Sequence, residues 1–100
     1  AVASCGLKES EARAKGISVE VKKAYFKANA RAKILGDDAG FAKIIVSAES
    51  GVILGASVIG AEATEIIHEL LLAVEQRLTA DALKRIIHAH PTVSEIVTHL

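Results

Sequence analysis

The sequence predicts a single α+β domain with a mostly antiparallel β-sheet and helices packed on one face. Three observations lead to this fold class. With 100 residues the chain is long enough for one core but not for two. Residues 17–59 contain short apolar or alternating segments separated by turns, which is typical of strands. After Gly60 the apolar residues recur at three-four spacing, and helices that follow strands indicate an α+β domain.

Composition limits the classes of function. The chain is 51% hydrophobic but only 3% aromatic, so aliphatic side chains must build the core. Twelve basic and twelve acidic residues give zero net charge, which predicts neither a nucleic-acid partner nor an anionic membrane surface. We find no run of about twenty apolar residues that would span a membrane. Cys5 is the sole cysteine, which excludes an internal disulfide and favours a reducing, cytoplasmic setting.

The N-terminal third predicts a helix between extended segments. Residues 1–7 form an extended segment, and residues 9–15 have the propensities of a short helix that Gly16 closes in the left-handed region. Residues 17–26 alternate apolar and polar side chains at period two, so they predict a half-buried strand. Residues 30–35 predict a second strand.

The middle of the chain predicts an antiparallel hairpin. Residues 36–40 are a turn by composition, and residues 41–48 and 52–59 are two apolar strands joined by the short turn at 49–51. Gly55 lies inside the second of these strands. A glycine in that position predicts a bulge or a close approach of another backbone segment.

Two helices are expected after the hairpin. The first runs from Glu62 to Gln76, and its apolar stripe consists of Ile66, Ile67, Leu70, Leu71 and Val74. Thr79 is the expected N-cap of the second helix, which runs through Ile86.

The sequence HAHPTVSE, residues 88–95, contains the single proline. Pro91 ends the preceding helix and favours an extended backbone at His90. Thr92 and Glu95 have the spacing of a capping box, which would start a last helix that continues to about His99. On this structural interpretation, His90 is a connector residue and Glu95 a cap.

A catalytic interpretation of the same segment stays open. Imidazole is the side chain that exchanges protons near neutral pH, and a carboxylate on its far nitrogen would fix the tautomer. His90 and Glu95 are close enough in sequence to form such a pair. Nothing else in the chain completes an active site, so a substrate or redox group would come from another domain or subunit.

A metal site is the second interpretation of these histidines. His88 and His90 would project to the same side of an extended segment, and His99 or His68 would complete the set. Because no paired-cysteine or His-Glu-x-x-His motif supports it, we predict no metal ligands. His68 is expected at the helix surface or the core edge, and Cys5 as a small buried hydrophobe.

The segment HAHPTVSE closely resembles the C-terminal signature of the dihydrolipoamide dehydrogenase family of pyridine nucleotide-disulfide oxidoreductases. The resemblance extends along the chain. It includes VASCGLKESEARAKG at the start, ANARAKILGDDAGFAKIIV in the middle, and GVILGASVIGAEATEII followed by LTADAL. Lys8, Cys5 and the pair Gln76 and Arg77 depart from the family pattern, where a threonine, a valine and a nearby glycine are usual.

The resemblance implies that residues 1–100 are a C-terminal interface domain, with the FAD and NAD domains outside this chain. A second copy of the chain would form a homodimer, and the enzyme would oxidise dihydrolipoamide of a 2-oxoacid dehydrogenase complex with NAD+. No cofactor would be bound to this fragment alone. The implied location is the cytoplasm, or the mitochondrial matrix in a eukaryote.

The resemblance also implies site residues. His90 would act across the dimer as acid and base at the partner's disulfide, Glu95 would hold its ring, and His90 with Pro91 would contact the partner's flavin. Two alternatives remain: the interface domain of a glutathione-reductase-like enzyme, which also has a His-Pro dipeptide before a glutamate, and a free-standing histidine-based metal-binding module.

Overall fold

The computed structural model describes residues 1–29, 39–60, 62–86, 94, 96–97 and 100. The secondary structure elements, in chain order, are β1 (Val2–Gly6), α1 (Glu9–Ala14), β2 (Val19–Tyr25), the 3-10 helix η1 (Phe26–Ala28), β3 (Phe41–Ser47), β4 (Ile53–Ile59), α3 (Ala63–Glu75) and α4 (Ala80–Lys84). An antiparallel sheet with helices confirms the predicted α+β class. The strand that we predicted at residues 30–35 lies outside the described residues.

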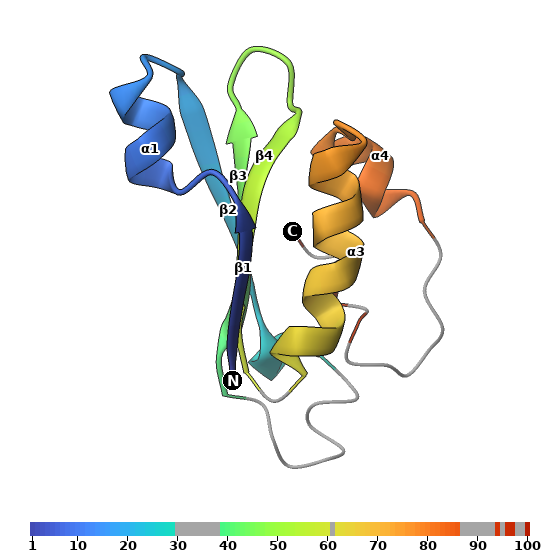
Figure 1. Cartoon of the computed structure of the whole chain (residues 1–100). Helices are drawn as coiled ribbons and strands as arrows, with labels where there is room; N and C mark the ends of the chain where they lie inside the picture. Colours follow the sequence, from blue (N-terminus) through green and yellow to red (C-terminus); the bar gives the residue numbers. More distant parts are fainter. Residues whose placement is uncertain (30–38, 61, 87–93, 95, 98–99) are drawn as a thin grey trace.

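The four strands form one sheet with the order β1-β4-β3-β2, and each neighbouring pair is antiparallel. β3 and β4 form the predicted hairpin, and the N-terminal extended segment is an outer strand that pairs with β4. Figure 1 shows α3 and α4 on one side of this sheet and the short helix α1 on the other side. The covering layer predicted from the sequence therefore consists of α3 and α4.

The prediction for Gly55 is confirmed. The pairing between β3 and β4 shifts register between Ile45 and Val46, because Ile45 pairs with Gly55 whereas Val46 pairs with Ile53. The extra residue in β4 is Leu54. A Cβ atom on Gly55 would lie only 1.9 Å from the carbonyl oxygen of Leu7, so the backbone after β1 passes directly against this position.

The core lies between the sheet and α3. Because aromatic residues are few, alanine, isoleucine, leucine and valine fill it, and small side chains let α3 pack close to the strands. The buried residues of this cluster include Ala42, Ile44, Val46, Ile53, Ala56, Val58, Ala63, Ile66, Leu70, Ala73, Leu83, Ile96 and Val97.

The expected helix at residues 62–76 is confirmed by α3, but one residue of its predicted apolar stripe is misplaced. Ile66, Ile67 and Leu70 are buried, as predicted, whereas Leu71 is 38% exposed. Ala73 is buried instead of Leu71. The stripe is narrower than the sequence suggested, because the helix presents its small residue to the sheet.

The helix α4 begins as predicted and ends earlier. The Thr79 hydroxyl accepts a hydrogen bond of 3.1 Å from the backbone N–H of Ala82, which confirms the N-cap. The helix ends at Lys84 rather than Ile86, because the N–H groups of Arg85 and Ile86 donate to carbonyls three residues back, at Ala82 and Leu83. Such bonds close a helix with a tighter turn.

The turn between α3 and α4 contains a residue in the left-handed region. Arg77 has φ 55°, a conformation that glycine adopts at less cost than any other residue. This explains why a glycine near this point would suit the turn. The turn is anchored on the hairpin, since the Ile53 N–H donates to the Leu78 carbonyl at 2.9 Å.

The prediction that Gly16 closes α1 in the left-handed region is confirmed, because Gly16 has φ 78°. At its start Lys8 has no acceptor atom in its side chain to cap the helix. The backbone N–H of Lys8 instead donates to the Glu11 carboxylate at 2.9 Å, which is half of a capping box. None of the helices described here has the length and apolar character needed to cross a membrane.

Candidate functional site

The site predicted from the sequence lies outside the described residues. This holds for His88, His90, Pro91, Glu95 and His99, and also for Thr92 of the predicted capping box. Their proposed roles therefore stay predictions. The structure does describe the residues on either side of them.

Both flanks of this segment are anchored in the core. Leu83 of α4 is buried before it, and Ile96, Val97 and Leu100 are buried after it. All four side chains belong to the cluster that packs between α3 and the sheet. Ser94, Ile96 and Val97 have 3-10 geometry, where the sequence predicted a last helix. The described residues before and after the sequence HAHPTVSE therefore belong to the same core.

The described residues give no support to a metal site. In the part of the chain that the structure describes, no group of three His, Cys, Asp or Glu side chains could hold a metal ion. His68 is exposed on α3, as expected for a helix-surface histidine. The set of His88, His90 and His99 falls outside the described residues.

The thiol of Cys5 is partly buried and packs against the core from β1. Burial, the largest effect, raises the pKa of this thiol above its ordinary value of 9.0, and the charge of Glu75 adds to the rise. A hydrogen bond with the backbone at Ala56 acts in the opposite direction. This environment is the opposite of the one that activates a cysteine nucleophile, so the prediction of a small packed residue agrees with the structure in kind, although burial is incomplete.

A second candidate site lies on the face of the sheet that α3 does not cover, which we call the open face. Directly opposed residues of antiparallel strands share a face, so the register defines three rows across it. The first row is Val2, Ile59, Phe41 and Tyr25. The second row, which we call the polar row, is Ser4, Ser57, Lys43 and Lys23. The third row is Gly6, Gly55, Ile45 and Val21.

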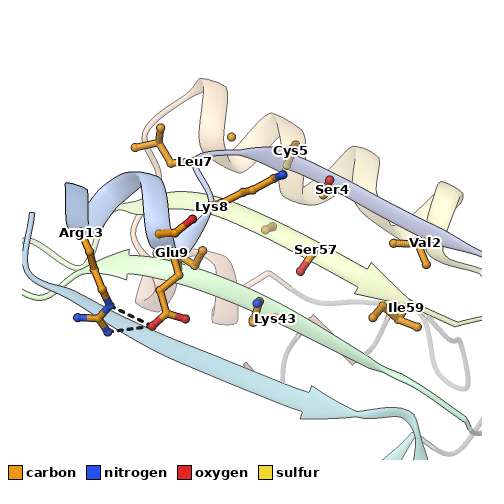
Figure 2. A pocket seen from close by; sticks show the side chains of 14 residues that line it. Val2, Ser4, Cys5, Leu7, Lys8, Glu9, Arg13, Lys43, Ser57 and Ile59 are labelled. Carbon is orange, nitrogen blue, oxygen red and sulfur yellow. Dashed lines mark hydrogen bonds and ion pairs between the residues drawn. The ribbon is translucent and has the colours of Figure 1, made fainter. Parts of the chain in front are cut away.

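A cleft of about 650 Å³ lies over this face, beside α1. It is lined by Val2, Ser4, Cys5, Gly6, Leu7, Lys8, Glu9, Ser10, Arg13, Lys43, Ile45, Ala56, Ser57 and Ile59. Figure 2 shows Lys43 and Ser57 on neighbouring strands, with the side chains of α1 at one end. The cleft combines an apolar floor with hydroxyl and ammonium groups.

The charges of the cleft are unbalanced. Glu9 is the acidic residue among its lining, and its carboxylate is bonded to the guanidinium of Arg13 at 2.9 Å. Lys8 and Lys43 remain as cations, and Lys23 lies directly opposite Lys43 on β2. The Lys23 ammonium is 5.2 Å from the centre of the Phe41 ring, a cation–π contact.

Sequence reasoning missed this second site. The alternation of β1, β3 and β4 indicates that Ser4, Lys43 and Ser57 face away from the core. Their alignment in one row depends on strand register, which the bulge at Leu54 and the order of the strands determine. The excess of lysine over acid in residues 22–43 was the available signal.

Comparison with known proteins gives a consistent result for the whole chain. The sequence profile of the pyridine nucleotide-disulphide oxidoreductase dimerisation domain matches residues 1–100. A dihydrolipoyl dehydrogenase from Geobacillus stearothermophilus is 48% identical over 94 residues, which are 94% of this chain and 20% of the relative.

Solved structures show the same fold. LpdA from Mycobacterium tuberculosis matches 97% of this chain with a TM-score of 0.88 and 29% identity. The HOCl-induced flavoprotein disulfide reductase RclA from Escherichia coli matches 99% with a TM-score of 0.91 and 28% identity. The chain covers 21% and 23% of these two proteins, so it spans about one fifth of the length of its relatives.

Proposed function

This chain belongs to the dimerisation-domain family of the pyridine nucleotide-disulphide oxidoreductases, and from this premise we propose that it is the interface domain of a flavin-dependent dihydrolipoyl dehydrogenase. The observation that carries the proposal is the 48% identity to a dihydrolipoyl dehydrogenase along nearly the whole chain. The enzyme would transfer electrons from dihydrolipoamide to NAD+. This domain would pair with a second copy of itself in a homodimer. The substrate of the enzyme would be the lipoamide of a 2-oxoacid dehydrogenase complex.

The cofactors FAD and NAD are assigned to the part of the protein that the relatives have in addition to this domain. Among the described residues, no glycine-rich turn opens a helix in the way that binds the pyrophosphate of a dinucleotide. From this chain, we propose His90 and Pro91 as contacts for the flavin of the partner subunit. When bound, FAD supplies the electron acceptor for thiol oxidation.

His90 is proposed as the acid and base of the reaction. A thiol becomes a competent nucleophile only as the thiolate, and a nearby imidazole accepts its proton. Glu95 would accept a hydrogen bond from the other ring nitrogen, which fixes the tautomer and stabilises the imidazolium. The buried anchors Leu83, Ile96 and Val97 on both sides of the segment support this role, because a proton-transferring group has to be held in place.

The test of His90 uses the full-length enzyme with the His90→Gln substitution. NAD+-dependent oxidation of dihydrolipoamide is expected to fall by about a hundredfold to ten-thousandfold, the usual contribution of a general acid–base group. The matched control is His68→Gln, since His68 is exposed on α3 and outside the motif. Its turnover should equal that of the wild type, and an equal turnover of His90→Gln would refute the role.

A complementation experiment tests whether His90 acts across the dimer. The His90→Gln enzyme is mixed during refolding with a variant that lacks the redox-active cysteines but keeps His90. If each histidine serves the partner's disulfide, a mixed dimer regains one complete site and activity rises above that of either parent. If the histidine serves its own subunit, both sites of the mixed dimer stay incomplete and no activity is regained.

A substrate comparison separates dihydrolipoyl dehydrogenase from a glutathione-reductase-like enzyme. The proposed function predicts efficient oxidation of dihydrolipoamide with NAD+ and little reduction of oxidised glutathione with NADPH. The reverse preference would agree with the family but would show that the substrate is oxidised glutathione rather than dihydrolipoamide.

A further inference from the structure

The polar row of the open face has an arrangement that costs stability. Lys43 lies on β3, a central strand, and it is only half-exposed between Ser57 and Lys23. Like charges directly opposite one another on antiparallel strands are destabilising. Within the described part of the chain, no carboxylate pairs with Lys8, Lys23 or Lys43.

Protection against aggregation does not explain this lysine. Charged side chains that prevent sheets from joining are placed on edge strands, where backbone groups are unpaired. Lys43 has a strand on each side, β4 and β2, so its backbone is already paired.

We propose that the cleft binds a small organic anion, with a carboxylate or phosphate head on a short aliphatic body. Residues that face each other directly across neighbouring strands have Cβ atoms about 5 Å apart, so Ser57 lies between Lys43 and Ser4 in the lining of one cleft. They supply an ammonium and two hydroxyl donors to the head. This site is independent of the proposed redox reaction.

The apolar lining of the cleft indicates that the part of the ligand beyond the charged head is aliphatic. Ile45 on β3 and Ile59 on β4 lie in the two rows next to the polar row, one on each side of it, and both line the cleft. Val2, which is 70% exposed, continues the apolar row to the edge of the sheet. A cleft of about 650 Å³ is within the range of small-molecule sites, and it would accept an aliphatic chain of several carbons beside the charged head.

The test measures binding of octanoate and octyl phosphate to the full-length protein by titration calorimetry at low ionic strength. We expect one site per chain for at least one of the two probes. Octanamide has the same aliphatic chain without the charge and should bind at least about tenfold more weakly, the loss expected when a hydrogen bond to a charged group is removed. Equal binding of octanamide would overturn the proposal, as would the absence of binding by both anions.

Variants locate the site. Lys43→Gln should weaken octanoate or octyl phosphate about tenfold or more, whereas Lys84→Gln removes the same charge from the exposed surface of α4 and should leave the affinity unchanged. If Lys43→Gln fails to fold, Ser57→Ala removes another proposed contact to the head and should also weaken binding. Unchanged affinity in the folded variants would overturn the proposal.

A chemical measurement on the wild-type protein needs no variant. Acetylation of Lys43, followed by mass spectrometry, should slow when the bound anion is present, while acetylation of Lys84 should proceed at the same rate. If Lys43 resists acetylation without any anion, another part of the protein covers the cleft and the proposal is wrong.

Discussion

Along β3, consecutive side chains meet two different surroundings. Ala42 and Ile44 lie on the covered face and are buried, whereas Phe41 and Lys43 lie on the open face and are partly exposed. Ile45 also lies on the open face, but it is buried where it pairs with Gly55. The covered face contains small and branched aliphatic residues that belong to one core cluster with α3, α4 and the buried C-terminal residues. The open face has an apolar row, a polar row with two opposed lysines, and a third row that contains two glycines. The covered face has the composition expected for stability alone, and the open face does not.

The largest expected effect comes from truncating matched isoleucines on the two faces. Ile44→Ala removes a fully buried side chain and should lower the free energy of unfolding by about 2–5 kcal/mol, because it leaves a cavity. Ile59 is 40% exposed at the open face, so Ile59→Ala should cost about 1 kcal/mol or less. Urea unfolding followed by circular dichroism measures both, and similar losses would contradict the division into two faces.

A second experiment separates the two ends of the open face. Gly55→Ala places a Cβ atom against the carbonyl of Leu7, a backbone atom that cannot rotate away, so the variant should lose about 1–3 kcal/mol. Ser57→Ala changes the same strand and the same face, two residues further, and should change the free energy of unfolding by about 0.5 kcal/mol or less.

The same urea measurement distinguishes the two results. If both variants have wild-type stability, the segment after β1 does not lie against Gly55. A large loss in both would mean that the serine, too, makes a structural contact that the open face does not otherwise require.

The covered face could be predicted from the sequence because it depends on local patterns. The three-four spacing of Ile66, Ile67 and Leu70 identified α3, and Thr79 identified the start of α4. Leu71 was misplaced because helix periodicity alone does not distinguish it from Ala73 at the edge of the stripe. Only the close packing of α3 on the sheet selects the smaller residue.

The open face could not be predicted in the same way. Its polar row joins Ser4 to Lys23 through β4 and β3, so it depends on strand order and register rather than on neighbouring residues. The histidine segment shows the reverse situation. Its motif of eight consecutive residues is enough to reveal the resemblance to a known family. The geometry of His90 and Glu95, however, lies outside the described residues.

The smallest effect compares a thiol on each side of β1. Cys5 faces the core, and burial raises the pKa of its thiol above 9.0, so the pH midpoint of its alkylation by iodoacetamide should lie above that value. In a Cys5→Ser background, Ser4→Cys places a thiol on the open face, in the polar row that contains Lys43. Nearby ammonium groups favour the thiolate, so the midpoint of this thiol should lie below that of Cys5.

The same shift has a consequence for stability. The folded protein holds the Cys5 proton at a pH where the unfolded chain releases it, so the contribution of this thiol is fully present below pH 9.0 and is lost as the pH rises through the folded value. Cys5→Ala should therefore lose less stability than the wild type between pH 8 and the alkaline limit of about pH 10, where lysines begin to titrate. If the pH midpoints of alkylation coincide for the two thiols, β1 does not separate a covered face from an open face.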